Sequence, residues 1–466
     1  MGKWKAFLLA VAAGAIIWLI PVPAGLKPQA WHLLAIFAAT ILGIILHPLP
    51  LGAMALLGIT VAAMTATLSV PQALSGFADA TVWLIVCAFL FARGFIKTGL
   101  GSRIAYMLMK AIGDSTLKLG YVLAISDLIL APATPSNTAR GGGVIFPIVR
   151  SLCSAFNSEP GPSARRVGAY LMLTQFQVNC ITSAMFMTAM AANPLIAVLA
   201  KKTLNLDISW GTWALAAAVP GLAAIAVMPY FIFKVFPPEL KNTPEAKELA
   251  ARELEKKGPV SRQEKVVLFV FIGALLLWAT SNFTHINATL VALIGVCVML
   301  IGEALEWKDI LDDKGPWDTL IWIGALMTMA GFLNNLGFIP WFAKMISANL
   351  GGIAWVPALV ILLFVYMYAH YGFASLTAHV TAMYPAFITV AAAVGAPPYL
   401  AALTMAFLSN LCGGLTHYST GTAPIYYGPG FLDQGKWWQM GFLVSLVNMV
   451  IWVILGGIWW KVLGLW

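Results

Sequence analysis

The chain has 466 residues, of which 61% are hydrophobic and 10% are charged, and its mean hydropathy is +0.87. A soluble protein carries about 25% charged residues, so this composition excludes a soluble domain and indicates a protein that crosses a membrane many times. The formal net charge of +9 does not indicate a nucleic-acid partner, because the basic residues gather on one predicted side of the membrane.

Eleven apolar runs are long enough to cross about 30 Å of hydrocarbon as α-helices. They begin at Ala6, Trp31, Leu51, Val82, Gly168, Thr212, Val266, Ala288, Thr319, Leu400 and Gly441. The first run follows a short basic segment, as a signal peptide does. It is long for one, however, and more membrane-type sequence follows, so we expect residues 1–30 to hold a retained first span. Without a transit peptide before it, this beginning favours a bacterial inner membrane.

Two further apolar stretches, residues 118–150 and 354–391, are interrupted near their middles. Pro135 to Asn137 break the first stretch, and Gly372 to Thr377 break the second. Backbone groups at such a break find no partner in lipid, so it is tolerated only where protein or a water-filled site supplies one. We therefore predict two re-entrant helical hairpins, an inner and an outer one, which are not spans.

The basic residues set the predicted orientation. If the N-terminus with Lys3 and Lys5 is cytoplasmic, eleven spans put the C-terminus in the periplasm and most other basic residues in the cytoplasm. These residues are Arg93, Lys97, Arg103, Lys110, Lys118, Arg150, Arg165 and Arg166. The cytoplasmic side also holds the charged segment 236–265, whose mixed signs at helical spacing predict a solvated linker between two halves.

The five cysteines are scattered and show no metal-ligand spacing. They are Cys87, Cys153, Cys180, Cys297 and Cys412. We interpret them as small core residues, and we expect no metal and no cofactor.

The chain contains an internal repeat. "SNTARGGGVIFP" from Ser136 matches "SLTAHVTAMYP" from Ser375, and a glycine lies 37 residues before the first serine and 38 before the second. Downstream, Pro194 matches Pro424 at an offset of 230 residues. The repeats are residues 31–235 and 266–466, and the spans before the two motifs run in opposite directions. Inverted repeats that contain broken helices are typical of transporters, which hold the substrate between them.

The first motif has the chemistry of an anion site. Ser136, Asn137 and Thr138 are favourable N-cap residues, and the helix after them presents free N–H groups and its positive dipole end. The glycines at 141–143 permit close approach of another backbone or a ligand. Arg140 lies one turn past the serine and is expected to point to the same place, where its charge binds a carboxylate of the substrate. An intramembrane arginine is costly enough that a functional role is the default.

The second motif repeats this pattern with Ser375 and Thr377, and with His379 in repeat register with Arg140. Taken singly, serines and threonines in membrane helices usually serve close packing, and a buried histidine is usually a hydrogen-bonded core residue. The match between the two repeats favours a functional role for Ser375, Thr377 and His379. His370 and His417 lack such support, and both interpretations stay open for them. Residues 168–198 and 400–430 are predicted to be matched broken helices, because glycine and proline interrupt each of them.

With these motifs the chain resembles the divalent anion/sodium symporter family, in particular the branch of plastid 2-oxoglutarate/malate translocators and bacterial citrate or tartrate:succinate antiporters. The similarity covers nearly the whole chain and includes "LAPATPSNTARGGG", "TSAMFMTAMAAN", "FASLTAHVTA" and "LTHYSTGTAPIYYGPG". It implies a homodimer in the lipid bilayer, with a static scaffold and an elevator-like transport domain that binds small di- or tricarboxylate anions.

The resemblance also implies a set of substrate-binding residues. The first hairpin tip supplies Ser136, Asn137 and Thr138, and the second supplies Ser375 and Thr377, where Leu376 replaces the asparagine of the family. The broken-helix residues of the same site are Asn193, Thr422 and Pro424.

Sodium-coupled members tend to carry a small threonine-like residue where this chain has Arg140 and His379. We therefore expect fixed side-chain charges to replace sodium. The chain is then expected to act as a sodium-independent antiporter that exchanges malate, succinate, fumarate or 2-oxoglutarate, with citrate as a further candidate substrate. A sodium- or proton-coupled symporter is the alternative within transport. A channel has no evident need for two symmetric tips. An intramembrane serine hydrolase would need a nucleophile motif that the serines do not have.

Overall fold

The computed structural model describes residues 2–280, 284–349 and 354–466, and within these ranges the regular secondary structure is helical. The helices of the first half are α1 (Lys3–Leu19), α2 (Pro28–Leu46), α3 (Leu51–Met64), α4 (Val70–Leu74), α5 (Ala80–Thr98), α6 (Leu100–Ile112), α7 (Thr116–Leu130), α8 (Phe146–Ala155), α9 (Gly168–Met185), α10 (Ala192–Leu204), α11 (Trp210–Val235) and α12 (Glu245–Lys257). Short 3₁₀ turns η1 (Ser75–Ala78), η2 (Ala131–Ala133) and η4 (Met187–Ala189) and a π-helical segment η3 (Ala139–Ile145) connect some of them.

The helices of the second half are α13 (Arg262–Ala279), α15 (Ala288–Ile301), α16 (Trp307–Asp312), α17 (Lys314–Asn335), α18 (Phe338–Asn349), α19 (Trp355–Ala369), α20 (Leu376–Ala393), α21 (Pro398–Leu411), α22 (Ala423–Tyr427), α23 (Gln434–Met449) and α24 (Gly456–Val462). The 3₁₀ turns η5 (His370–Gly372) and η6 (Cys412–Gly414) and the π-helical segment η7 (Val450–Leu455) lie among them.

Each of the eleven apolar runs predicted from the sequence coincides with a helix. Seven described helical stretches are at least 18 residues long and apolar enough to cross a membrane; α3 and α15 are apolar but shorter. Three of the seven are arms of the predicted hairpins, namely Thr116–Ala133, Trp355–Gly372 and Leu376–Ala393. Length and apolarity alone therefore do not separate hairpin arms from spans; the breaks at the tips do.

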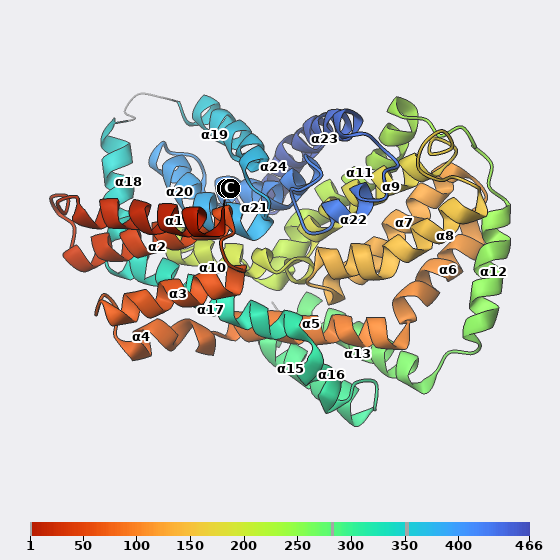
Figure 1. Cartoon of the computed structure of the whole chain (residues 1–466), viewed down its shortest axis with the longest axis horizontal. Coiled ribbons are helices and arrows are strands. Elements are labelled where there is room, and N and C mark those ends of the chain that lie inside the picture. The colour runs from red at the N-terminus through yellow and green to blue at the C-terminus, as the bar shows by residue number, and fades with distance from the viewer. Residues whose placement is uncertain (1, 281–283, 350–353) are drawn as a thin grey trace.

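The two halves contain the same order of elements. In each half a long helix (α5 or α17) precedes a shorter one (α6 or α18), a broken hairpin (α7–α8 or α19–α20) and an interrupted helix (α9–α10 or α21–α22). The hairpins lie on opposite sides of the molecule, and α9 packs against α21 between them (Figure 1). This order agrees with the repeat that the sequence predicts, while the assignment of residues to domains stays a prediction.

Segment 236–265 is not simply a solvated linker. It contains the helix α12, which packs along α6, and Ala246 and Ala250 of α12 are fully buried (Figure 1). Lys247 of α12 joins the helix to the base of the first hairpin by pairing with Asp114, which also pairs with Lys118 of α7. Hydrogen bonds from Lys118 and Lys247 lower the pKa of this partly exposed Asp114 carboxyl to about 2. The sequence indicated the helical charge pattern, but not the apolar face that binds α6.

Several basic residues predicted to share one side of the membrane contact acidic side chains or backbone carbonyls. Arg93 and Lys97 of α5 pair with Asp309 of α16, and Arg165 donates to the carbonyl of Pro237 in the linker. Most of these contacts are exposed, so each contributes little stability. They join α5 to α16, and the segment before α9 to the start of the linker.

The ion pair between Arg103 and Glu264 is the buried exception. The Nε to Oε1 distance is 2.6 Å, and the side chains are only 8% and 3% exposed. Glu264 also completes the capping box that begins α13 at Ser261, and Arg103 donates to the carbonyl of Gly258. This pair therefore joins α6 of the first half to the start of the second.

We expect Arg103→Ala to destabilise the fold by about 3–5 kcal/mol, because it leaves the Glu264 carboxylate buried without its partner. The matched control is Arg262→Ala, whose contact with Glu303 is 3.9 Å long between side chains that are 73% and 72% exposed. That variant should change stability by less than about 1 kcal/mol. Thermal unfolding in detergent checks both; equal effects of the two substitutions would contradict the assignment.

Candidate functional site

The first hairpin turns at residues 134–136, where the chain leaves helical geometry. Ser136 restarts the helix, because its Oγ accepts a hydrogen bond from the N–H of Ala139 at 3.1 Å and its carbonyl accepts one from the N–H of Arg140. The first N–H groups of a helix have no partner within it, so those of Asn137 and Thr138 remain for other acceptors. The tip is therefore suited to bind an anion.

The tip packs against the interrupted helix of the other half. Asn137 donates to Thr420 Oγ1 at 3.0 Å, and the hydroxyl of Tyr426 donates to the carbonyl of Gly141 at 2.8 Å. A Cβ at Gly141 would lie 2.9 Å from Thr422 Cγ2, so glycine is needed for this approach. The glycines after the tip also unwind the helix into the π segment η3, a distortion that frequently marks functional sites.

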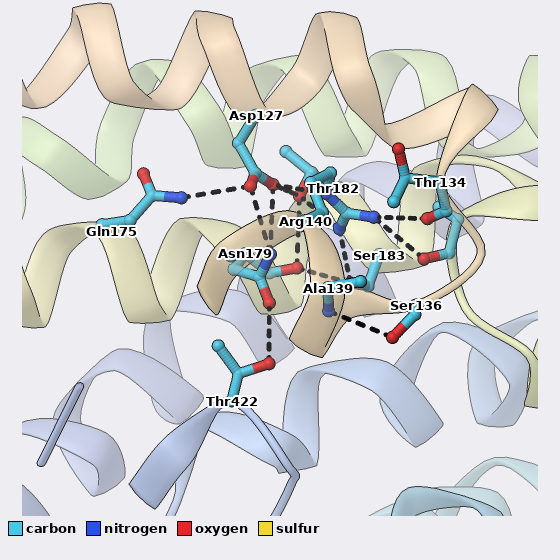
Figure 2. Close-up of polar contacts among 12 residues, drawn as sticks. Asp127, Thr134, Ser136, Ala139, Arg140, Gln175, Asn179, Thr182, Ser183 and Thr422 are labelled. Carbon is cyan, nitrogen blue, oxygen red and sulfur yellow. Dashed lines mark hydrogen bonds and ion pairs between the residues drawn. The ribbon is translucent and has the colours of Figure 1, made fainter. Parts of the chain in front are cut away.

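Arg140 lies beneath this tip with its side chain fully buried, and Asp127 of α7 pairs with it (Figure 2). The Nε group donates to Asp127 Oδ2 at 3.1 Å, and Nη1 donates to the carbonyls of Thr134 at 2.9 Å and Ala189 at 3.0 Å. Nη2 donates to the hydroxyls of Thr182 and Ser183. All five guanidinium N–H groups therefore have acceptors within the protein.

Asp127 is held as completely as its partner. Gln175 and Asn179 of α9 each donate to Oδ1 at 3.1 Å, and the hydroxyl of Thr182 donates to Oδ2 (Figure 2). A buried carboxylate and guanidinium that are paired and fully hydrogen-bonded avoid the desolvation penalty of isolated charges. The polar network joins both arms of the first hairpin to α9.

The expectation that Arg140 offers a free positive charge to a ligand is therefore wrong for this structure. Its charge is cancelled by Asp127, and its donors are used by the hairpin and by the loop between α9 and α10. Sequence analysis missed Asp127, although a lone acid in the apolar run "YVLAISDLIL" is a usable signal, because an intramembrane acid needs a partner.

The second hairpin tip is built in the same way. Ser375 Oγ accepts from the N–H of Ala378 at 3.3 Å, and the carbonyl of Ser375 accepts from the N–H of His379. Ser375 and Thr377 are partly exposed, whereas Leu376 is buried. A Cβ at Gly413 would lie 3.2 Å from Leu376, so this leucine packs against the second interrupted helix instead of presenting an amide, as an asparagine would.

His379 lies beneath the second tip and is fully buried, and His370 of η5 is buried beside it. The two Nδ1 atoms are 3.1 Å apart, and His370 Nε2 is 2.9 Å from the carbonyl oxygen of Ser419. The ring of Tyr366 meets the His379 ring edge to face at 4.5 Å. His370, left open by the sequence, therefore belongs to this cluster. His417 instead accepts from Trp438 Nε1 at 3.0 Å.

The two clusters occupy equivalent places in the repeat. Arg140 corresponds to His379 and Asp127 to Tyr366, each at an offset of 239 residues. In the interrupted helices Thr182 corresponds to Cys412 and Ala189 to Ser419, at an offset of 230. Thus Arg140 binds the Ala189 carbonyl in one half, and the histidine pair binds the equivalent Ser419 carbonyl in the other. Each cluster fastens a hairpin to its interrupted helix.

The remaining predicted residues divide into two groups. Asn193 is fully buried and donates to the carbonyls of Ser183 and Phe186, while its Oδ1 accepts from Asn410 Nδ2 at 2.8 Å, so it braces the break in the helix. Thr422 is also buried, and Pro424 is exposed in the first turn of α22. Five of the predicted substrate-binding residues keep accessible surface, namely Ser136, Thr138, Ser375, Thr377 and Pro424.

Three side chains that can bind a metal ion lie close together beneath the second tip. Their potential metal-ligand atoms are within 4.8 Å of one another, and the residues are His370, His379 and Cys412. We do not assign a metal to them, because the Nδ1 atoms already bond to each other and a divalent ion with one thiolate would leave a net charge buried without a counter-ion.

We expect Gly141→Ala to destabilise the folded protein by about 1–3 kcal/mol, because the new methyl group would overlap Thr422 and Asn179. Gly143→Ala is the matched control: it changes the same π segment, and a Cβ there meets nothing within 4 Å. Thermal unfolding in detergent should separate the two variants. If both unfold at the wild-type temperature, the close approach of the tip to the interrupted helix is not required.

Comparison with known proteins places the chain in a family. The family description "Sodium:sulfate symporter transmembrane region" matches residues 1–466. The putative malate transporter YflS of Bacillus subtilis is 52% identical, over 100% of this chain and 97% of that protein. Dicarboxylate transporter 1 from spinach chloroplasts is 48% identical, over 99% of this chain and 82% of that protein. The inner membrane protein YbhI of Escherichia coli is 38% identical, over 99% and 98% of the two chains.

Among solved structures, the YdaH transporter of Alcanivorax borkumensis has a TM-score of 0.57 over 98% of this chain and 97% of that chain. Its sequence is only 14% identical, so the comparison supports the fold alone. The match of the family over the full length confirms the resemblance that the hairpin motifs indicated. The chain belongs to the divalent anion/sodium symporter family and is a multi-pass membrane transporter, not an enzyme.

Proposed function

We propose that this transporter exchanges dicarboxylate anions across a bacterial inner membrane without sodium. The substrate class rests on two supports: relatives over the full chain carry the names malate transporter and dicarboxylate transporter, and the two hairpin tips end in unpaired helix N–H groups. Two tips suit the two carboxylates of one molecule. Ser136, Thr138, Ser375 and Thr377 are the proposed hydroxyl donors beside these N–H groups.

One observation carries the sodium independence: the Arg140 guanidinium binds carbonyls that a sodium ion would otherwise coordinate. Carbonyls of unwound backbone at hairpin tips and interrupted helices are the usual ligands of coupling ions in such transporters. Here the carbonyls of Thr134 and Ala189 accept from Arg140, and that of Ser419 lies against His370. A side chain thus holds each hairpin to its interrupted helix, and no sodium ion is needed to do so.

The proposal of obligatory exchange no longer rests on the charge of Arg140, because Asp127 cancels it. It rests on the tips themselves. When the transport domain moves through the membrane without substrate, the first N–H groups of both tip helices and their neighbouring hydroxyls pass through a low-dielectric region without acceptors, at a cost of several kcal/mol. A bound dicarboxylate accepts hydrogen bonds from these groups.

The elevator movement, the homodimer and the cytoplasmic N-terminus remain parts of this proposal.

The alternatives have less support. A sodium-coupled symporter would need open ligands where Arg140 already donates. A serine hydrolase would need a serine beside a histidine base, yet Ser136 and Ser375 cap helices and His379 Nδ1 bonds to His370.

Proteoliposomes loaded with succinate should take up labelled malate, and empty ones should not, because the empty carrier crosses slowly. Replacing external sodium by choline should leave the exchange rate unchanged. Robust sodium-dependent uptake into empty proteoliposomes would instead establish symport. Counterflow with a panel of di- and tricarboxylates identifies the substrates.

The guanidinium itself can be tested by chemical rescue. Arg140→Ala should lose most exchange and unfold at a lower temperature, because Asp127 is left buried without a counter-ion. Added guanidinium chloride should restore part of the exchange rate and part of the unfolding temperature. Sodium chloride should restore less of each, since only guanidinium reproduces the hydrogen-bond donors of the arginine side chain. Arg150→Ala is the control, since Arg150 is a partly exposed residue of the same hairpin that pairs with Glu159 at 3.4 Å. Wild-type exchange by Arg140→Ala without rescue would refute the proposal.

A further inference from the structure

The histidine pair beneath the second tip has a fixed arrangement of protons. The carbonyl of Ser419 can only accept a hydrogen bond, so His370 Nε2 carries a proton and donates. The Nδ1 atom of a neutral His370 is then an acceptor, and His379 Nδ1 must donate to it across 3.1 Å. If His379 is also neutral, its Nε2 atom holds an unprotonated lone pair.

That lone pair has no partner. His379 Nε2 is buried and without a hydrogen bond among the described residues, although the rest of its ring is enclosed by Tyr366, Phe373 and His370. Buried polar atoms normally find partners, and an exception calls for a functional reason. An unpaired imidazole nitrogen in a protein interior is a base that is available to a proton.

The repeat explains why a cation fits here. The equivalent place in the first half holds a permanent cation, the guanidinium of Arg140, which is balanced by Asp127. In the second half Tyr366 stands at the Asp127 position, and its hydroxyl is 2.7 Å from Ser409 Oγ. A positive charge on His379 would therefore have no counter-ion among the residues that the structure describes. It would be costly in the empty carrier and favourable once an anion is bound at the adjacent tip.

Within the described part of the chain, the other ionisable groups around α20 do not supply that counter-charge. Besides Tyr366 and His370, the cluster holds the thiol of Cys412. Lys202 of α10 donates to the Met327 carbonyl, in a cavity that Thr381 also lines, and His32 of α2 stacks on Trp18. Lys344 of α18 is exposed. These groups are cationic or neutral, so a bound dicarboxylate is the source of negative charge at this tip.

We propose that His379 takes up one proton at Nε2 when a dicarboxylate binds, so that each direction of exchange carries a dianion together with a proton. This inference rests on the proposed function. The proton would reduce the net charge of the loaded tips from two negative charges to one. By linkage, a ligand that favours proton binding is itself bound more tightly when protons are abundant.

The test is calorimetric titration of purified wild-type carrier with succinate, in two buffers of different ionisation enthalpy. At about pH 8 simple carboxylic acids are fully ionised, so proton uptake is assigned to the protein. We expect uptake of about one proton per succinate, and a Kd that rises about tenfold per pH unit. Binding without proton uptake overturns this inference and leaves the proposed function intact. Absence of both succinate binding and exchange overturns the proposed function itself.

The residue is tested with His379→Asn, because an asparagine amide can donate to His370 from the place of the imidazole Nδ1 but takes up no proton. We expect it to bind succinate without uptake, whereas the control His32→Asn keeps the wild-type value. Uptake that persists in His379→Asn rejects His379 as the site. Should that variant fail to fold, infrared difference spectra of the wild type decide: succinate must induce an imidazolium band, and its absence overturns the inference.

Discussion

The buried ion pair of Asp127 and Arg140 is the interaction on which the organisation of the first half depends. It connects the first arm of a hairpin, the hairpin tip, α9 and the loop before α10 in one network of buried residues. Such a pair adds little net stability relative to apolar residues of the same size, because desolvation offsets the attraction. Its contribution is to specify geometry: five donors of fixed direction permit only one position of the tip relative to the interrupted helix.

The second half solves the same geometrical problem with weaker and titratable groups. Two imidazoles in series replace one guanidinium, a phenol replaces a carboxylate, and the equivalent backbone carbonyl is bound in both halves. The halves are therefore alike in what they fasten and different in their charge. One tip rests on a neutralised, permanent cation, and the other rests on a neutral base that has room for a proton.

The sequence was sufficient for the architecture because its strongest signals are local. Apolar runs, proline and glycine breaks and serine caps predicted the helices, both hairpins and both interrupted helices, and these features agree with the structure. The partner of Arg140 was not predictable in this way. Asp127 is 13 residues away on the opposite arm, and only the folded hairpin shows that the two side chains meet. The same limit applies to His370, which no periodicity joins to the carbonyl of Ser419.

The difference between the halves bears on how coupling could change within one fold. A cation site formed by carbonyls and hydroxyls is open to any monovalent ion of suitable size, whereas Arg140 fills such a place with a charge that never leaves the protein. Under the proposed function, substrate movement no longer depends on an ion gradient, and an acid must stay buried beside the arginine. In the second half Tyr366 stands at the position of the acid, and the two histidines occupy the position of the arginine without a permanent charge. If His379 takes up the proposed proton, positive charge enters this tip only with the substrate, and the loaded and empty carriers differ electrostatically.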